Sequence, residues 1–598
     1  MKAIKLQQFL SRKFKNSGKE KAITMILSRY NRESKCLDGT WELIPDPYES
    51  FDGQEIYKPK KEREYGRPLD FNLDNGYSVD IPASWGEVLN EFLYYEGWMW
   101  HTKKFSWHGE REGRVFLRLS GVNYKSQVWL NGEKLGSHEG GFTPFTFEVT
   151  ESLEQGDNLL VVLVDNKRHE DYIPELRTDW YNFGGIHRSV ELISVPESFI
   201  RNYKLETSLS EDQVKFSIRA WVDGFEEEKV LELKIPELGL EEELNSVGNS
   251  EFYSEFTLPR ERVELWSTDN PKLYDVSLSY GEDSIDDRVG FREVEVEDGE
   301  ILLNGESIWL RGISMHEEEV GKGRALDSTD VEKRFERLRE LNCNFARLAH
   351  YPHTPEMAQK ADEEGILLWE EVPAWQDISF EKEEVRDLHK QQLREMIQRD
   401  WNRASVILWS IANETDHTDE DRNEALPEMA DYVKELDSSR LVTAACFIDE
   451  EDDRERIYID DPLEESLDVI GINEYYGWYY GDADDMKNFD EDPNSTPVII
   501  SETGGGAKWG LHSSEDETWT EEYQNDIYKK QIEALKQKSQ IKGMSPWIFF
   551  DFRTPRRMNE YQRGYNRKGL MDETGRKKQA FYTLKKFYRE KQEQVQCH

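Results

Sequence analysis

Residues 406–414 read Val-Ile-Leu-Trp-Ser-Ile-Ala-Asn-Glu, an apolar run that stops abruptly at an amide and a carboxylate. The run has the length and composition of a buried strand, and the polar pair Asn413-Glu414 marks its end. In α/β folds, functional side chains gather where the strands end at their carboxyl side. This stretch therefore indicates both a strand of an α/β domain and a candidate site at its tip.

Seven further apolar runs lie on both sides of this stretch, and helical stretches separate most of them. This alternation is the mark of βα units, and eight strand candidates in about 290 residues fit a (β/α)₈ TIM barrel. The segment 327–342 is a clear helix candidate, with Thr329 and Glu332 as its expected capping box. The expected strands are 308–316, 343–350, 366–373, 406–412, 441–447, 469–475, 497–501 and 543–552, the last of which contains Trp547.

The chain before the barrel has a different pattern, with short strand candidates separated by turn signals. Asn131-Gly132 supplies the positive-φ pair of a tight hairpin, and strands at this spacing predict a β-sandwich over residues 31–195. Residues 196–292 repeat the pattern and predict a second, smaller sandwich. We thus expect a multidomain β plus α/β protein, with a basic extension at 1–30 and the barrel at 293–598.

The composition describes a folded and strongly acidic protein. The 598 residues carry a net charge of −45, and 18 Trp, 27 Tyr and 27 Phe exclude a fully disordered chain. Residues 1–35 hold ten Lys or Arg against two Glu, a net of +8, so the remaining residues carry −53. Such an excess repels nucleic acid and predicts adaptation to concentrated salt. We expect the acidic runs 226–228, 317–319 and 449–453 to lie on the surface.

The basic leader has three readings: a solvated extension, a nucleic-acid arm, or residues preceding a natural start at Met25. It lacks interleaved aromatic residues, which favours the solvated extension. No apolar run reaches the ~18–20 residues of a membrane helix, and the N-terminus lacks the apolar core of a secretory signal. We expect a soluble, cytoplasmic protein without nucleic-acid or membrane partners. Its four cysteines lie far apart without a CxxC pair, which argues against a disulfide scaffold or a structural zinc site.

Two carboxylates end strands of the expected barrel, Glu414 after the fourth strand and Glu502 after the seventh. Glycosidic hydrolysis needs such a pair, one to protonate the leaving oxygen and one to attack the anomeric carbon or activate water. The alternative is that both are ordinary loop carboxylates. His350, the segment 473–479 and Trp547 add rings and polar groups at the same mouth, which favours a sugar site.

With these residues the chain resembles glycoside hydrolase family 2, and most closely its β-glucuronidases. The resemblance spans roughly residues 30–590 and implies a sugar-binding jelly roll, an immunoglobulin-like sandwich and a catalytic barrel. The motifs that carry it are Leu37-Asp-Gly-Thr-Trp41, Gly97-Trp-Met-Trp-His101, Asn182-Phe-Gly-Gly-Ile-His-Arg188, Trp266-Ser-Thr-Asp-Asn-Pro-Lys-Leu-Tyr274, His350-Tyr-Pro352, Trp409-Ser-Ile-Ala-Asn-Glu414, Asn473-Glu-Tyr-Tyr-Gly-Trp-Tyr479 and Ser501-Glu502.

The resemblance implies a retaining mechanism, with Glu414 as acid/base and Glu502 as nucleophile. Asn413 would bond the sugar 2-hydroxyl, and Tyr475 would donate to Glu502 and favour its ionised form. The nearby second acid should raise the pKa of Glu414. The resemblance implies no cofactor and no metal, and the sequence offers no convincing ligand cluster. His350, Tyr479 and Trp547 complete the expected sugar-binding residues of the barrel.

The sugar is inferred from Asn566-Arg-Lys568, because an Asn-x-Lys pair in β-glucuronidases holds the C6 carboxylate of the sugar. Asp179 would contact sugar hydroxyls, and Arg563 is a further candidate. The substrate would be a β-glucuronide or a related uronic-acid oligosaccharide. Thr178 stands where relatives often have His, and Thr503 where an aromatic residue is common.

The alternatives are a β-galactosidase or β-galacturonidase of the same family and a non-catalytic carbohydrate-binding protein. A galacturonide carries the same carboxylate, whereas a protein that only binds sugar needs neither Glu414 nor Glu502. We also expect a homo-oligomer, either a dimer or a tetramer.

Overall fold

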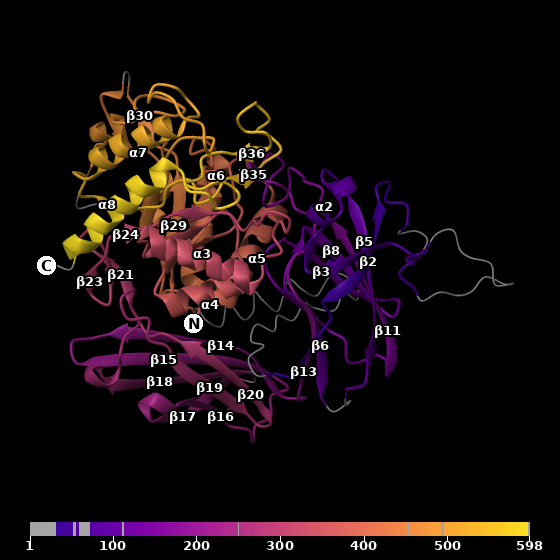
Figure 1. Cartoon of the computed structure of the whole chain (residues 1–598). Helices are drawn as coiled ribbons and strands as arrows, with labels where there is room; N and C mark the ends of the chain where they lie inside the picture. Colours follow the sequence, from indigo (N-terminus) through magenta and orange to yellow (C-terminus); the bar gives the residue numbers. More distant parts are fainter. Residues whose placement is uncertain are drawn as a thin grey trace.

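The computed structural model describes residues 32–51, 55–58, 72–109, 113–248, 250–451, 454–491 and 496–595. Three regions follow one another along the chain: a β-sandwich in indigo and purple, a second sandwich in magenta, and a barrel that runs from magenta to yellow (Figure 1). The expected multidomain β plus α/β architecture is confirmed. The basic extension 1–30, Met25 included, lies outside the described residues.

The first sandwich pairs a four-stranded with a six-stranded antiparallel sheet around one apolar core. Asn131 and Gly132 have φ values of 52° and 85°, so the predicted tight hairpin between β8 and β9 is confirmed. The first sheet runs β1 (Ser34–Cys36), β13 (Val190–Val195), β6 (Arg114–Leu119), β10 (Phe145–Glu148), and the second β3 (Tyr77–Ile81), β2 (Gly39–Asp46), β5 (Trp98–Trp107), β11 (Gly156–Asp165), β8 (Lys125–Leu130), β9 (Glu133–Glu139). A small third sheet joins β4 (Ala83–Ser84), β12 (Gly185–Ile186) and β7 (Val122–Asn123), and the short helices are α2 (Trp85–Val88) and η3 (Asn90–Phe92).

The second sandwich alternates buried and exposed residues along its strands, as one-sided sheets do. Strand β17 pairs with β16 along its first half and with β18 along its second, and so connects the two layers. The strands in sheet order are β14 (Phe199–Leu209), β15 (Gln213–Asp223), β18 (Glu251–Pro259), β17 (Leu240–Gly248), β16 (Leu231–Ile235), β19 (Tyr274–Tyr280) and β20 (Asp283–Val289), with the 3₁₀ turns η4 (Pro236–Leu238) and η5 (Arg260–Arg262). A small antiparallel sheet of β21 (Val294–Glu297), β22 (Glu300–Leu303) and β23 (Glu306–Ser307) follows.

The barrel is a closed parallel sheet whose first strand is split into two short pieces. One piece pairs with the last strand and the other with the second strand, which closes the ring. The predicted strand 308–316 is thus interrupted at Gly312 and Ile313. The strands are β24 (Leu310–Arg311), β25 (Ser314–Met315), β26 (Phe345–Leu348), β27 (Leu367–Glu371), β28 (Val406–Asn413), β29 (Leu441–Cys446), β32 (Val469–Asn473), β33 (Val498–Glu502) and β34 (Ile541–Met544).

The last strand is shorter than expected, and it ends before Trp547. Pro546 lacks a backbone N–H, so it cannot continue the ladder of hydrogen bonds. Trp547 therefore belongs to the segment after the strand rather than to the strand itself. This segment continues to a two-stranded ribbon of β35 (Phe552–Arg553) and β36 (Tyr565–Asn566).

Helices cover the outside of the barrel between most strands (Figure 1). The cap of α3 lies two residues before the expected one. Asp327 rather than Thr329 is the N-cap, Asp330 rather than Glu332 completes the capping box, and the helix begins at Ser328. In the described parts of the two connections from β29 to β33, the helical segments are 3₁₀ turns, η7 (Pro462–Ser466) and η8 (Asp485–Asn488). The α-helices are α3 (Ser328–Leu341), α4 (Pro355–Glu364), α5 (Glu383–Asp400), α6 (Glu420–Leu436), α7 (Glu521–Leu535) and α8 (Gln579–Val595).

Buried polar contacts fix the first sandwich against the mouth of the barrel. The Arg188 guanidinium donates to Glu317 at 2.8 Å, and the Tyr181 amide donates to the Arg553 carbonyl at 3.0 Å. Glu317, expected on the surface, is therefore buried; its charge is balanced by Arg188. This docking carries residues 178–182 of the sandwich to the barrel mouth.

Among the described residues, no helix combines the length and the apolar character needed to cross a membrane.

Candidate active site

The end of β28 is shaped so that Glu414 leaves the strand at the barrel mouth. The pairing of β28 with β29 shifts register between Ser410 and Asn413, and such bulges re-aim side chains at strand ends. Glu414 itself has φ 52°, a left-handed conformation that is costly for a non-glycine residue. Its amide donates to the Ala445 carbonyl at 2.8 Å, which helps hold this conformation.

The Glu414 carboxyl is held by two amide side chains. Gln376 Nε2 donates to Oε2 and Asn473 Nδ2 donates to Oε1, each at 2.9 Å. Burial raises the pKa of Glu414, and the nearby Glu502 carboxylate raises it further, against the two amide bonds. The direction agrees with the sequence expectation, although burial is the larger cause. Glu414 is thus suited to carry a proton.

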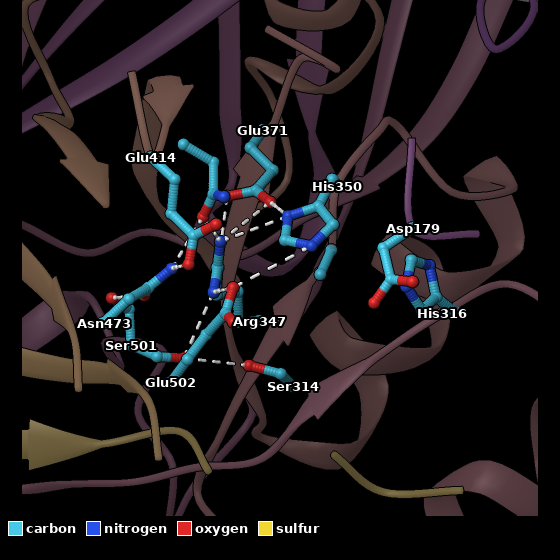
Figure 2. Close-up of polar contacts among 12 residues, drawn as sticks. Asp179, Ser314, His316, Arg347, His350, Glu371, Glu414, Asn473, Ser501 and Glu502 are labelled. Atoms are coloured by element: carbon cyan, nitrogen blue, oxygen red, sulfur yellow. Dashed lines mark hydrogen bonds and ion pairs between the residues drawn. The ribbon is translucent and has the colours of Figure 1, made fainter. Parts of the chain in front are cut away.

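Glu502 ends β33 and accepts hydrogen bonds on both carboxylate oxygens. Arg347 NH1 donates to Oε1 at 2.9 Å, and the Tyr475 hydroxyl donates to Oε2 at 2.6 Å. His350 Nε2 lies 3.8 Å from Oε1 (Figure 2). Side-chain donors therefore hold both carboxylate oxygens of Glu502 in place.

Arg347 joins the two halves of this arrangement (Figure 2). Its fully buried guanidinium also donates to Asn413 Oδ1 at 2.6 Å and to both oxygens of Glu371 at 3.1 Å. Burial opposes its charge, but Glu371 and Glu502 outweigh burial and raise the pKa of Arg347. Glu371 in turn accepts from His350 Nδ1 at 2.7 Å, which orients that ring.

Aromatic rings form one wall of the mouth. The His350 ring stacks on Trp547 with centroids 4.8 Å apart, and Trp180 of the first sandwich lies 5.4 Å from His350. His316 packs edge-on against Trp547 at 5.2 Å, and its buried Nε2 has no hydrogen-bond partner within the described chain. Burial keeps the pKa of His316 well below its usual range, so the ring is neutral.

A cationic end lies beside this wall. Lys568 Nζ donates to the Tyr479 hydroxyl at 2.5 Å and lies 4.9 Å from the centre of the Tyr475 ring. Burial lowers the pKa of Lys568, while the Tyr479 phenol opposes that shift. Arg557 Nε donates to both oxygens of Asp179 at 3.0 and 3.1 Å, and Asn566 Nδ2 donates to Asp179 at 3.3 Å.

The structure brings most of the predicted site residues to this one mouth, directly or through a shared neighbour. Arg563 is not among them: its side chain is exposed, and its Nε donates to the Glu560 carbonyl of its own loop. Thr178 and Thr503 are buried, and the Thr503 hydroxyl bonds Gln531 behind the site. The residues brought together are Asp179, His350, Asn413, Glu414, Tyr475, Tyr479, Glu502, Trp547, Asn566 and Lys568.

Several residues of the mouth were missed by the sequence reading. Glu371 ends β27 and was findable, because the rule that singled out Glu414 and Glu502 applies to it equally. Arg347 also carried a signal, namely a charge inside an apolar strand, which demands buried partners. Gln376 and Arg557 had no comparable signal in the local sequence. Asn473 lies in the quoted motif 473–479 and His316 in the expected strand 308–316, but neither was proposed as a site residue.

Among the residues that the structure describes, no group of three or more His, Cys, Asp or Glu is arranged to hold a metal ion.

Comparison with known proteins identifies the family. Family models match in chain order: the sugar binding domain of glycosyl hydrolases family 2 at residues 54–196, the family 2 domain at 198–292, and the family 2 TIM barrel domain at 294–592. The barrel match alone spans half of the chain.

Relatives with similar sequences or structures have related activities. The β-glucuronidase of Paenibacillus borealis is 27% identical over 588 residues, which cover 88% of this chain and 91% of the relative. The crystal structure of Ruminococcus gnavus β-glucuronidase is 26% identical, with a TM-score of 0.82 and coverage of 95% and 99%. A β-galacturonidase from Eisenbergiella tayi, solved with galacturonate, is 25% identical, with a TM-score of 0.79 and coverage of 94% and 97%. The two carboxylates at the barrel mouth and the family matches over all three regions agree, and the chain belongs to glycosyl hydrolase family 2.

Proposed function

We propose that this glycoside hydrolase releases β-linked D-glucuronic acid from glucuronides by a retaining, exo-acting mechanism. The observation that carries the sugar assignment is Lys568, a buried cation at the sugar mouth whose neighbours are the rings of Tyr475 and Tyr479. A buried ammonium without a carboxylate partner is costly, so the site favours a sugar that brings one. The β-glucuronidases among its relatives support the same sugar.

The two carboxylates divide the chemistry between them. Glu502, held in place by Arg347 and Tyr475, attacks the anomeric carbon, while Glu414, with its raised pKa, donates a proton to the leaving oxygen. Glu414 then acts as general base and activates the water that releases the sugar.

Asn413 is suited to stabilise the charge that develops on the sugar. Its Oδ1 accepts from Arg347 and from Asn473, which fixes the amide, and its buried Nδ2 has no partner within the described residues. A fixed, unused donor beside Glu502 is available to the sugar 2-hydroxyl, where hydrogen bonds strengthen in the transition state.

A panel of p-nitrophenyl β-glycosides tests the proposal. We expect the glucuronide to be hydrolysed with a higher kcat/KM than the galacturonide. The galactoside should have a far lower kcat/KM than the glucuronide, because a neutral sugar leaves Lys568 unpaired. Faster hydrolysis of the galactoside or the galacturonide would refute the sugar assignment. No hydrolysis of any member would favour a carbohydrate-binding protein.

Replacement of the proton donor should affect substrates according to their leaving groups. We expect Glu414→Ala to reduce hydrolysis of an alkyl glucuronide at least about 100-fold more than that of a 2,4-dinitrophenyl glucuronide, whose leaving group needs little protonation. The alkaline limb of the wild-type pH profile, caused by deprotonation of Glu414, should disappear. Initial rates from pH 4 to 9 measure both effects, and added azide should yield the β-azide. Equal losses on both substrates would contradict the acid/base role.

The net charge supports a prediction about salt. The residues after position 35 carry −53, and runs such as Glu226 to Glu228 are exposed. The Debye length falls from ~10 Å at 0.1 M salt to ~3 Å at 1 M, so salt relieves repulsion between neighbouring acids. We expect the Tm and the activity to rise between ~0.1 and above ~1 M KCl. A Tm that is flat or falls over that range would contradict adaptation to salt.

Two further expectations from the sequence stay predictions. A homo-oligomer, dimer or tetramer, is testable by sedimentation at several salt concentrations. A cytoplasmic location is testable by fractionation of the source cells.

A further inference from the structure

A cavity of about 600 Å³ adjoins Glu414 at the mouth of the barrel. Gln376 and Asn473, which hold the two Glu414 oxygens, also line this cavity. An acid/base donates its proton to the leaving-group oxygen, so the leaving group lies against Glu414. If the proposed function holds, this cavity is therefore the place of the aglycone, the part of the substrate that is not the glucuronic acid.

The charged residues of this cavity are acidic. Besides Glu414, the described residues of its lining include Asp377, Asp416 and Glu450, one histidine (His417), and no Lys or Arg. Arg177 forms an ion pair with Asp377, and Arg454 lies 3.7 Å from Glu450, so each of these two acids has a nearby cation that offsets part of its charge.

Asp416 is exposed and accepts hydrogen bonds from the Thr418 amide at 2.9 Å and the Thr418 hydroxyl at 2.7 Å, which lower the pKa of its carboxyl; nearby His417 and Arg422 lower it to a smaller extent. The glucuronate end, with Lys568 and Arg557, has the opposite sign.

The same cavity has an apolar face. Phe447 and Tyr480 line it and keep 38% and 37% of their surface exposed, so both rings are accessible to a ligand in the cavity. Tyr480 is held edge-on by Tyr476 with centroids 4.7 Å apart, and its hydroxyl accepts from the Tyr475 amide at 2.9 Å. These contacts fix one ring of the cavity before any ligand binds.

We propose that the aglycone cavity selects a flat, uncharged or cationic leaving group and discriminates against an anionic one. Phe447 and Tyr480 provide stacking surfaces, while Asp416 and Glu450 repel a carboxylate or a sulfate and attract a cation. A chain of uronic acids is therefore a poor substrate, because its second sugar would place a carboxylate in this acidic cavity. The enzyme instead removes single glucuronic acids from flat, non-anionic partners.

The test uses three aryl glucuronides that differ only in a meta substituent: aminomethyl, hydroxymethyl and carboxymethyl. A methylene spacer keeps the acidity of the leaving phenol similar, so differences in kcat/KM report the charge of the aglycone. At 0.1 M KCl we expect the aminomethyl compound to exceed the carboxymethyl compound by about 10-fold or more. At 1 M KCl this ratio should shrink toward one, because the Debye length falls to ~3 Å.

A matched pair of double variants assigns the effect to the cavity. In Asp416→Asn/Glu450→Gln the ratio at 0.1 M KCl should fall to about 3-fold or less, since two charges near the aglycone are lost. In Glu227→Gln/Glu228→Gln, with the same change of net charge in the second sandwich, the ratio should equal that of the wild type. If the first double variant does not fold, Asp416→Asn alone serves, because Asn can still accept from Thr418.

Equal rates for the three aglycones in the wild type, or equal ratios in the two double variants, would overturn this inference. Failure of the proposed function has a different result, namely that none of the three glucuronides is cleaved while another glycoside is. The three aglycones attached to that other sugar would then rank by charge if the inference holds, and would react alike if it does not.

Discussion

Glu502→Gly should lower the turnover of every β-linked substrate by at least about 10⁴-fold, the scale on which loss of a nucleophile acts. Glu502 is the carboxylate that accepts hydrogen bonds from both Arg347 and Tyr475 at the end of β33. Added azide should restore part of the activity and yield the α-azide, because the small anion enters from the side that the carboxylate has vacated. Rates with 2,4-dinitrophenyl glucuronide and NMR of the product measure both effects.

Two controls make this result interpretable. Glu502→Gln keeps the size of the side chain and should be equally inactive, but without rescue, because the amide fills the space that azide needs. Thermal melting of both variants excludes unfolding, a real concern since removal of Glu502 leaves the buried Arg347 with one carboxylate fewer. A β-azide product from Glu502→Gly would mean that Glu414 and Glu502 have exchanged roles.

Lys568→Ala should cost glucuronide hydrolysis about 2–3 kcal/mol of transition-state stabilisation, roughly 30- to 150-fold in kcat/KM. The ammonium is buried beside Tyr475 and Tyr479, so a sugar carboxylate that reaches it has few competing water contacts. Any weak activity on a neutral galactoside should be nearly unchanged, since that sugar never pairs with the ammonium. Equal losses on both substrates would contradict recognition of the carboxylate.

Arg563→Ala is an informative companion variant from the same loop. Its exposed side chain bonds the Glu560 carbonyl, so we expect its kcat/KM on the glucuronide to stay within about 2-fold of the wild type. A loss comparable to that of Lys568→Ala would mean that Arg563 turns toward the sugar when substrate binds. Arg557, and not Arg563, holds Asp179. We therefore expect Arg557→Ala to lower kcat/KM on the glucuronide, because this substitution frees the Asp179 carboxylate beside the sugar.

The barrel and its carboxylates were predictable from the sequence because they depend on local patterns. A strand buried on both faces is apolar along its length, so a run such as residues 406–412 can be recognised in the sequence. The polar residue that ends such a strand lies at the barrel mouth because of the topology of the barrel. Asn131-Gly132 likewise fixes a hairpin, since its positive φ values are a property of those two residues. The cap of α3 was misassigned by two residues, because Asp327 and Thr329 are both competent N-caps.

The sequence by itself predicted the order of the three regions from its periodicity, and it placed Glu414 and Glu502 at the ends of two barrel strands from residue type; their roles came from the family resemblance and stay predictions. Only the tertiary structure decided which side chains surround those acids. Arg347 donates to Glu371, Asn413 and Glu502, each of which lies on a different strand of the barrel. Arg557 rather than Arg563 holds Asp179, and an acidic cavity adjoins Glu414. These contacts join residues tens to hundreds of positions apart, and their geometry depends on barrel closure and on the docking of the first sandwich, which no local pattern encodes.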